Sequence, residues 1–270
     1  MNVLSLFDGI SCGQLALRRA GICYDVYHAS EIDEHAIQVT SSHFPNTNQL
    51  GDVTGILDCG SVDLLMGGSP CQGFSRCGRG LAFNDDRSKL FFEFMRLLDS
   101  CNPRYFLLEN VKMKQEYQDI ISGYLGVSPC EINSSCVSKQ MRKRLYWTNI
   151  PFTLPEDVGD NFDGWLYQLG HGYLRDQIKF YVKYPTLVAQ SPASKYRIIV
   201  DLDVAKKCSL KRLRRDSSVT RCATPEECEE FQTLPVGYTS CLKKTHRYRV
   251  IGNGWTVDVV SHILKGISNG

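Results

Sequence analysis

The sequence has no long apolar run. Its apolar stretches, such as residues 62–66, span only a few positions, whereas a membrane-spanning helix needs about 20. The first residues show no basic leader followed by an apolar segment, so we expect no secretory signal and no membrane partner. The lack of a secretory signal leads us to expect a location in the cytoplasm or in a nucleus. Because 43% of the 270 residues are hydrophobic and 22% are charged, the composition favours a packed globular protein.

The sequence also lacks any C-x-x-C pair, although it contains 12 cysteines. Neighbouring cysteines such as Cys71 and Cys77, or Cys130 and Cys136, have five residues between them. This spacing favours neither a zinc site nor a redox pair, so we expect no metal. Most of the cysteines are expected to be small, reduced, buried side chains.

The net charge is only +2, but it is unevenly spread along the chain. Residues 171–220 hold eleven Lys or Arg against four Asp and no Glu, which is +7, so the rest of the chain sums to −5. Residues 241–249 add four basic residues and no acid. Such asymmetry suggests a polyanionic partner, although a solvated face explains the charge equally well.

The first 150 residues alternate between strand and helix patterns, which predicts an α/β fold with a doubly wound, mostly parallel sheet. Helices are expected at residues 11–20, 34–43 and 87–101. Strands are expected at residues 3–7, 24–30, 62–66, 105–108, 130–137 and 145–148.

The pattern changes after Pro151, where periodicity weakens and aromatic residues become frequent. We expect a small irregular lobe over residues 151–247, with a strand at residues 195–200. A helix at 255–267 is expected to return to the first domain, which would then comprise residues 1–150 and 248–270. The sequence does not define the oligomeric state.

Acidic and nucleophilic residues follow the predicted strands, namely Asp8, Glu31, Asp52, Cys71 and Glu109. Ligands of doubly wound sheets bind beyond the carboxyl ends of the strands. These residues are therefore expected to share one edge of the sheet.

A glycine-containing turn between the first strand and helix, residues 6–13, is typical of a nucleotide or nucleoside site. Its pattern is not G-x-G-x-x-G, which argues against a dinucleotide-dependent dehydrogenase. Glu31, after the second strand, is placed to bind ribose hydroxyls. Asp52 could hold an adenine amino group.

Cys71 lies in the segment Gly67-Gly68-Ser69-Pro70-Cys71-Gln72-Gly73-Phe74-Ser75. A nucleophilic thiolate needs a rigid, accessible position, which a Pro-Cys turn between glycines provides. An arbitrary cysteine is more often a buried structural residue, but this setting favours the nucleophile. The glycines that follow, up to about Asp86, suit a lid over a substrate.

Glu109 ends another predicted strand and could act as an acid toward a ring nitrogen. The pattern Gln140-x-Arg142-x-Arg144 would alternate along a strand, so both guanidiniums would point to one face. They could hold Glu109, a substrate oxygen and the Cys71 thiolate. A basic strand face can also be merely solvated.

Together these segments resemble the DNA cytosine-5 methyltransferases along nearly the whole chain. The motifs that carry the resemblance are Phe7-x-Gly9, Glu31, Asp52, Gly68-Ser69-Pro70-Cys71-Gln72, Asp86-Arg87-x-x-Leu90-Phe91-Phe92, Glu109-Asn110-Val111, Gln140-x-Arg142-x-Arg144, Arg221-x-x-Thr224-Pro225-Glu226-Glu227, Gln232-x-Leu234-Pro235 and Gly252-Asn253-Gly254-Trp255-Thr256-Val257. The start, Phe7-Asp8-Gly9-Ile10, and Trp255 are more similar to the de novo branch than to the common Phe-x-Gly-x-Gly-Gly start. The chain is short for a bacterial member, so the resemblance implies a small target-recognition lobe.

The resemblance implies the class I S-adenosylmethionine-dependent methyltransferase fold, with S-adenosylmethionine as donor and S-adenosylhomocysteine as product. It implies catalysis by Cys71, Glu109, Arg142 and Arg144, and substrate contacts from Gln72, Ser75, Asn110 and Gln140. It implies cofactor contacts from Phe7, Asp8, Gly9, Ile10, Cys12, Gly13, Glu31, Ile32, Asp52, Val53, Ser69, Pro70, Leu90, Asn253, Gly254 and Trp255.

Double-stranded DNA is the implied partner, with a cytosine flipped out of the duplex and, in a bacterium or phage, a nucleoid location. The resemblance is compatible both with a cognate restriction endonuclease as partner and with an orphan protein that has none. The alternatives are a tRNA cytosine-5 methyltransferase of the same fold and an inactive DNA-binding paralogue.

Overall fold

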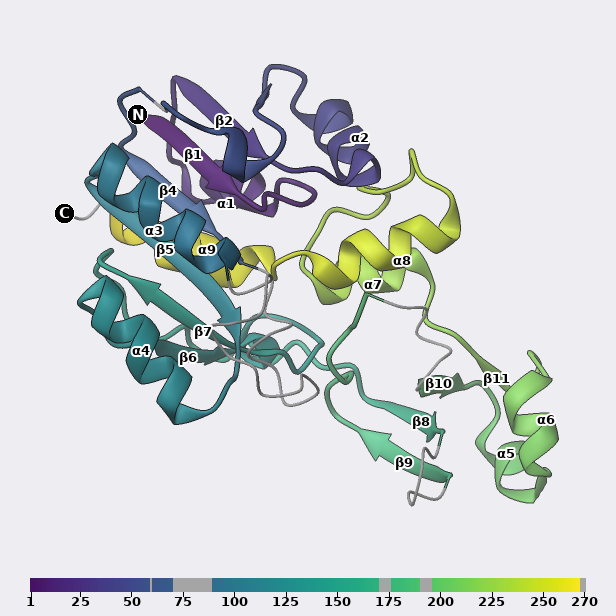
Figure 1. Ribbon diagram of the computed structural model, residues 1–270. Helices are drawn as coiled ribbons and strands as arrows, with labels where there is room; N and C mark the ends of the chain where they lie inside the picture. The colour runs from purple at the N-terminus through teal and green to yellow at the C-terminus, as the bar shows by residue number, and fades with distance from the viewer. Residues whose placement is uncertain (59, 70–88, 170–175, 190–195, 268–270) are drawn as a thin grey trace. The chain divides into compact units, whose positions relative to one another are not determined.

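The computed structural model describes residues 1–58, 60–69, 89–169, 176–189 and 196–267. The chain divides into two compact units (Figure 1). Unit 1 comprises Met1–Asn133, Lys143–Pro155 and Val257–Gly270, and unit 2 comprises Ser134–Arg142 and Glu156–Thr256. Compared with the expected boundaries, residues 134–142 and 248–256 fall in unit 2, and residues 151–155 fall in unit 1.

Unit 1 contains a seven-stranded sheet in the order β3-β2-β1-β4-β5-β7-β6, in which β7 alone runs antiparallel to its neighbours β5 and β6. Its elements are β1 (Asn2–Leu6), α1 (Cys12–Ala20), β2 (Val26–Ser30), α2 (Glu34–His43), β3 (Asn48–Gln49), η1 (Val53–Gly55), β4 (Leu64–Gly67), α3 (Lys89–Cys101), β5 (Tyr105–Val111), α4 (Gln115–Leu125), β6 (Cys130–Asn133), β7 (Lys143–Thr148), α9 (Val257–Leu264) and η5 (Lys265–Ile267). The predicted doubly wound, mostly parallel sheet is confirmed, and the order reverses between β1 and β4.

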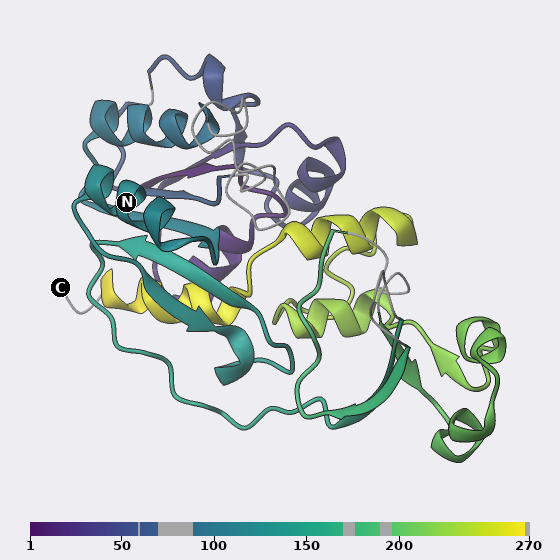
Figure 2. The same ribbon diagram turned by 60° about the horizontal axis from the view of Figure 1, so that its bottom comes forward.

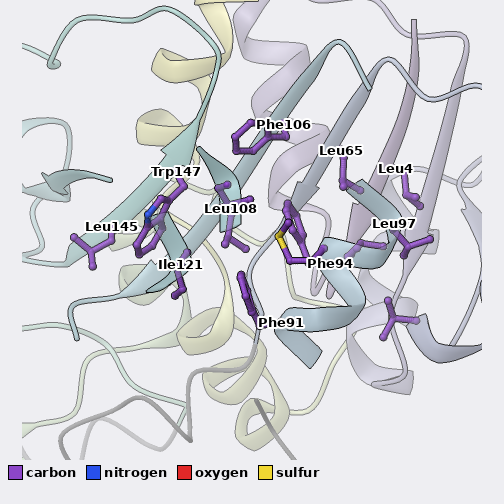
Figure 3. Packing of buried hydrophobic residues seen from close by; sticks show 14 of the residues in the cluster. Leu4, Leu65, Phe91, Phe94, Leu97, Phe106, Leu108, Ile121, Leu145 and Trp147 are labelled. Atoms are coloured by element: carbon purple, nitrogen blue, oxygen red, sulfur yellow. The ribbon is translucent and has the colours of Figure 1, made fainter. Parts of the chain in front are cut away.

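Helices cover both faces of this sheet, with α3 and α4 on one side and α1 packed against α9 on the other (Figures 1 and 2). The α3 side holds the larger apolar cluster (Figure 3). Phe91, Phe94 and Leu97 of α3 lie there over Leu65 and Leu108 of the central strands. Because both faces are covered, the central strands consist of continuous apolar residues. In sheets of this kind, ligands bind at the carboxyl ends of the strands.

Two expected boundaries in unit 1 are wrong in ways that matter for the site. β5 continues to Val111, so Glu109 and Asn110 lie within the strand and not beyond it. The strand expected at 130–137 ends at Asn133 and is followed by the 3-10 turn η3 (Ser134–Cys136). Helix α4 was not expected, although its buried residues Tyr117, Ile121 and Leu125 recur every four positions.

Unit 2 is not irregular as expected, because it contains a four-stranded sheet in the order β11-β10-β8-β9, with every neighbour antiparallel. Its remaining elements are β8 (Gly164–Gln168), β9 (Gln177–Tyr181), β10 (Tyr196–Ile199), α5 (Leu202–Lys207), α6 (Leu210–Arg215), β11 (Thr220–Arg221), α7 (Pro225–Phe231) and α8 (Lys244–Asn253). A capping box between Thr224 and Glu227, with Pro225 in the first turn, starts α7.

In the described part of the chain, no helix is both long and apolar enough to cross a bilayer. Eight of the nine cysteines in that part carry free thiols. Cys101, at the end of α3, is disulfide-bonded.

Candidate active site

The candidate site of unit 1 is the edge at which β1, β4 and β5 end. Leu6, the last residue of β1, pairs with Gly67 of β4, and Gly67 pairs with Leu108 of β5. Phe7 and Glu109 each come one residue after this common level. The sheet therefore brings the N-terminal loop and Glu109 to the same edge, as the sequence predicted.

The loop after β1 adopts a conformation that few sequences tolerate. Phe7, Gly9 and Ser11 all have left-handed φ angles, of 56°, 60° and 55°, which cost a non-glycine residue of order 1 kcal/mol or more. The Asp8 carboxylate, which is buried, accepts hydrogen bonds from the Ser11 hydroxyl and, at 2.7 Å, from the Tyr27 hydroxyl. The expected contact of Asp8 with a cofactor is therefore not supported, because its side chain points into unit 1 and braces the loop.

Burial raises the pKa of Asp8 to about 6, and hydrogen bonds such as that from Ser11 oppose the rise. A carboxyl whose pKa is raised on folding binds more protons in the folded than in the unfolded state between about pH 4 and pH 6. Its unfavourable contribution to stability is therefore absent at low pH, appears as the pH rises through this window, and is complete above pH 6.

Asp8→Asn is expected to remove this dependence. Relative to the variant, the wild-type free energy of unfolding should fall by about 2.4 kcal/mol between pH 4 and pH 7, since one pKa unit corresponds to about 1.4 kcal/mol and part of the effect is already present at pH 4. Urea unfolding of both proteins at several pH values measures the difference. Parallel curves for the two proteins would show that Asp8 is not a buried carboxylate.

Glu31, directly after β2, also binds the loop that follows β1. Its carboxylate accepts hydrogen bonds from the backbone N–H groups of Gly9 at 2.7 Å and of Ile32 and Asp33 at 2.8 Å. The side chain of Ile32 is 72% exposed. An acid fixed beside an exposed apolar side chain suits a nucleoside, whose hydroxyls need acceptors and whose base needs apolar contact.

Asp52 is exposed and caps η1, where its Oδ1 accepts hydrogen bonds from the backbone N–H and hydroxyl of Thr54. These hydrogen bonds lower its pKa. An ionised, exposed carboxylate is an acceptor that could bind an amino group.

Other predicted cofactor residues of unit 1 are buried by the protein itself, namely Ile10, Cys12, Gly13 and Val53. Val53 belongs to the apolar cluster, and Leu90 packs against it from α3. Side-chain contacts from Ile10, Cys12 and Val53 are therefore not supported, and Gly13 has no side chain, which leaves the backbone of these residues as the part that could face a ligand.

Glu109 and Arg144 form an ion pair, with 2.8 Å between Arg144 Nε and Glu109 Oε1. The register of β5 and β7 pairs Arg144 with Val111, so Glu109, two residues earlier, lies on the same face and diagonal to Arg144. Both side chains are nearly buried, with 14% exposure for Arg144 and 11% for Glu109. The guanidinium thus holds one oxygen of the acid at the carboxyl end of β5.

Asn110 points to the opposite face of β5 and is buried. Its Nδ2 donates to the backbone oxygen of Ser69 at 3.4 Å and to the Ser69 hydroxyl at 3.3 Å. Asn110 therefore contacts the residue that precedes Pro70-Cys71 in the sequence. The predicted site residues Pro70, Cys71, Gln72 and Ser75, and the expected lid up to Asp86, lie outside the described residues.

The expectation that Gln140, Arg142 and Arg144 alternate on one strand is wrong. β7 begins at Lys143, and the two earlier residues belong to unit 2. Gln140 is fully buried, with its amide bonded to Leu187, Phe231 and Gln232. Its expected substrate contact is therefore not supported, and the Arg142 guanidinium donates to backbone oxygens of unit 2.

Asn253, Gly254 and Trp255 lie in unit 2 at the end of α8. Asn253 is exposed and Trp255 half-buried, whereas Gly254 is buried. The cofactor contacts expected of Asn253 and Trp255 therefore remain a prediction that their exposure permits.

The strand order and the antiparallel β7 at the end of a parallel sheet define the class I S-adenosylmethionine-dependent methyltransferase fold. Two solved structures share it over the whole chain. One is a DNA modification methyltransferase encoded within an Escherichia coli prophage, with 20% identity, a TM-score of 0.64 and coverage of 100% of this chain and 99% of the other. The second is a variant of DNMT2 from Spodoptera frugiperda, with 22% identity, a TM-score of 0.71 and coverage of 99% of both chains.

The chain belongs to the C-5 cytosine-specific DNA methylase family, whose sequence model matches residues 1–119 and 134–269. The orphan methyltransferase M.Rho11sI of Bacillus phage rho11s is 43% identical over 116 residues, which are 42% of this chain and 23% of the relative. The type II methyltransferase M.NgoBI of Neisseria gonorrhoeae is 41% identical over 174 residues, which are 58% of this chain and 54% of the relative. The matched segments thus span about a quarter to a half of these relatives.

Proposed function

We propose that the chain methylates C5 of cytosine in double-stranded DNA, with S-adenosylmethionine as donor. The observation that carries the proposal is the Glu109–Arg144 ion pair at the carboxyl end of β5. Asn110 of the same strand contacts Ser69, which precedes Pro70-Cys71 in the sequence. Membership of the cytosine-specific DNA methylase family supports the same proposed reaction.

In the proposed reaction the Cys71 thiolate adds to C6 of the cytosine, which raises the electron density at C5. Glu109 donates a proton or a hydrogen bond to N3, so that negative charge does not build up on the ring. Arg144 orients Glu109 and binds the cytosine oxygen. Loss of the C5 proton and expulsion of Cys71 then restore the aromatic ring.

S-adenosylmethionine, when bound, supplies the methyl group. In unit 1, Phe7 is proposed to contact the adenine, Glu31 the ribose hydroxyls and Asp52 the adenine amino group. The described geometry suits these roles, because Glu31 and Asp52 are fixed acceptors at the ligand edge. In unit 2, Asn253 and Trp255 are proposed to contact the methionine part.

Unit 2 is proposed to bind the DNA backbone through α6. The residues Ser209, Lys211, Arg212, Arg215 and Asp216 line a shallow hollow of ≈ 360 Å³. Arg212 forms an ion pair with Asp216 at 2.8 Å. All three basic residues are exposed, but Lys211 and Arg215 form no ion pair with another described residue, which makes them the better candidates for phosphate contacts.

Lys211→Ala/Arg215→Ala is expected to lower the slope of log K against log salt for duplex binding by about two, since each phosphate contact contributes about 0.9. Fluorescence anisotropy over a salt series measures the slope. Lys265→Ala, an exposed lysine of unit 1, should leave it unchanged. An unaltered slope in the double variant would place the phosphate contacts elsewhere.

Transfer of a labelled methyl group to duplex DNA and to tRNA tests the substrate, with Cys71→Ser as the inactive control. DNA labelling followed by bisulfite sequencing of the product would identify the methylated site. Labelling of tRNA alone, or of neither, would contradict the proposal. A duplex containing 5-fluorocytosine should become covalently attached to the wild-type protein, because the fluorine blocks the final elimination.

A further inference from the structure

Four segments of unit 2 meet around three buried polar side chains, Gln140, Arg142 and Gln232, whose exposures are 0%, 4% and 0%. The segments are residues 138–142, 187–189, 231–232 and 251–256. Burying polar groups at this density costs free energy unless each group is hydrogen-bonded. The hydrogen-bond partners of the three side chains therefore show which segments of the backbone this cluster holds in place.

Arg142 donates to three backbone oxygens. Its Nη1 lies 3.0 Å from the oxygen of Leu187, and its Nη2 lies 3.1 Å from that of Gly252 and 3.0 Å from that of Gly254. The last two oxygens belong to the C-terminal end of α8 and the turn after it, where carbonyl groups lack helical partners and carry partial negative charge. The guanidinium thus remains buried and charged by capping this helix end.

Gln232 also forms hydrogen bonds with this turn. Its Nε2 donates at 3.0 Å to the oxygens of both Ile251 and Gly254, and its Oε1 accepts from the Thr256 hydroxyl at 2.9 Å. The Gly254 oxygen consequently accepts hydrogen bonds from Arg142 and from Gln232. Two side chains that are 90 positions apart in the sequence are therefore coupled through one carbonyl group.

Gln140 links the cluster to the segment at 187–189. Its Oε1 accepts from the backbone N–H of Leu187 at 2.7 Å, while Arg142 donates to the oxygen of the same residue. Its Nε2 donates to Gln232 Oε1 at 3.1 Å. Because each donor in the cluster faces an acceptor, the hydrogen bonds select one conformation for the turn.

We propose that Arg142, supported by Gln140 and Gln232, is a positioning residue that fixes the turn at residues 252–256. In this role Arg142 acts through the exposed Asn253 and the half-buried Trp255, and not on the cytosine. The inference rests on the proposed function, because it takes these two residues to bind the methionine part of S-adenosylmethionine. Lysine cannot replace Arg142 fully, since an ammonium group lacks the planar fork that reaches carbonyl groups in different directions.

The test measures cofactor binding separately from chemistry in Arg142→Lys and Gln232→Leu. Both variants should raise the KM for S-adenosylmethionine and the Kd for S-adenosylhomocysteine by about tenfold, the effect of losing one or two hydrogen bonds of the turn. The turnover number at saturating donor should stay within about threefold of wild type. The Arg142→Lys/Gln232→Leu double variant should show less than the sum of the two effects on binding free energy, since both side chains share the Gly254 oxygen.

If Arg142→Lys lowers the turnover number by about 100-fold or more while the Kd for S-adenosylhomocysteine stays at the wild-type value, the inference is overturned and Arg142 is a catalytic residue. Unchanged KM and Kd in both single variants would overturn it as well. If Arg142→Lys does not fold, Gln232→Leu tests the same carbonyl group without removing a buried charge. Failure of the wild-type protein itself to bind S-adenosylhomocysteine would instead refute the proposed function.

Discussion

Glu109→Gln is expected to slow methyl transfer by about 100- to 1000-fold, the usual effect of removing one group that stabilises developing charge. Glutamine has nearly the same shape, and its amide oxygen can still accept from Arg144 Nε, which lies 2.8 Å from the carboxylate in the wild type. The substitution therefore removes the transferable proton and the charge while it preserves the packing at the end of β5.

Single-turnover transfer of a labelled methyl group to duplex DNA measures the effect, and the Kd for S-adenosylhomocysteine shows whether the cofactor site is intact. Glu93→Gln is a matched control, because Glu93 also forms a Glu–Arg ion pair, at 2.7 Å from Arg96 on the surface of α3. The control should retain the wild-type rate. A Glu109→Gln protein with a rate within about tenfold of wild type would mean that Glu109 does not act on the cytosine ring.

Much of unit 1 could be predicted from the sequence, because its signals are local. The helix at 34–43 has the expected bounds, and the buried strands are short apolar runs bounded by turn residues. Once a parallel sheet is inferred, the carboxyl ends of its strands meet at one edge. The common level of Leu6, Gly67 and Leu108 follows from that rule and needs no long-range information.

The position of Gln140 and Arg142 could not be predicted in this way. Alternation of side chains holds only within a continuous strand, and the backbone enters β7 only at Lys143. The hydrogen bonds of Arg142 then come from segments 45 and 110 positions away. No spacing within a Gln-x-Arg-x-Arg pattern encodes such partners.

Of the sheet of unit 2, only β10 was expected, as the strand at residues 195–200, and its other strands were missed for a related reason. Neighbouring positions Trp165 and Leu166 of β8 are both apolar, yet one is 36% exposed and the other is buried. The apolar/polar alternation that identifies a half-buried strand is therefore hidden. The pairing of β8 with β10 also joins residues about 30 positions apart, which local patterns do not reveal.

The hydrogen bonds of Asp8 depend both on local sequence and on residues of other elements. Its position after β1 was predictable from the sequence. Its partners Ser11 and Tyr27 come from different elements, so the direction of the carboxylate depends on tertiary packing. A strand-end rule can place this residue at the ligand edge, but it cannot tell on which side of the loop the carboxylate lies.

Gly252→Ala is expected to destabilise unit 2 by about 3 kcal/mol, at the upper end of the usual cost of overpacking. A Cβ atom at Gly252 would lie 2.3 Å from the backbone oxygen of Val188 and 2.7 Å from the backbone nitrogen of Ala189. Both contacts are with main chain, so no side-chain rotation can relieve them. α8 can approach this segment closely only because residue 252 has no side chain.

Gly123→Ala provides the matched control, because Gly123 lies within α4 and a Cβ atom there would meet nothing within 4 Å. This control should stabilise the protein by about 0.5–1 kcal/mol, since alanine favours helix. Thermal unfolding should show a Tm lowered by roughly 5–10 °C for Gly252→Ala and slightly raised for Gly123→Ala.

Gly252→Ala should also affect cofactor affinity, because the end of α8 that packs on residues 188–189 is hydrogen-bonded to Arg142. The Gly252 oxygen accepts from Arg142 at 3.1 Å, so a shift of α8 away from Val188 also moves an acceptor of the guanidinium. We therefore expect folded Gly252→Ala protein to bind S-adenosylhomocysteine more weakly than wild type, in parallel with its lower Tm. A variant with unchanged Tm would show that α8 does not pack on the backbone of residues 188–189, and the hydrogen bonds assigned to Arg142 would then need a different geometry.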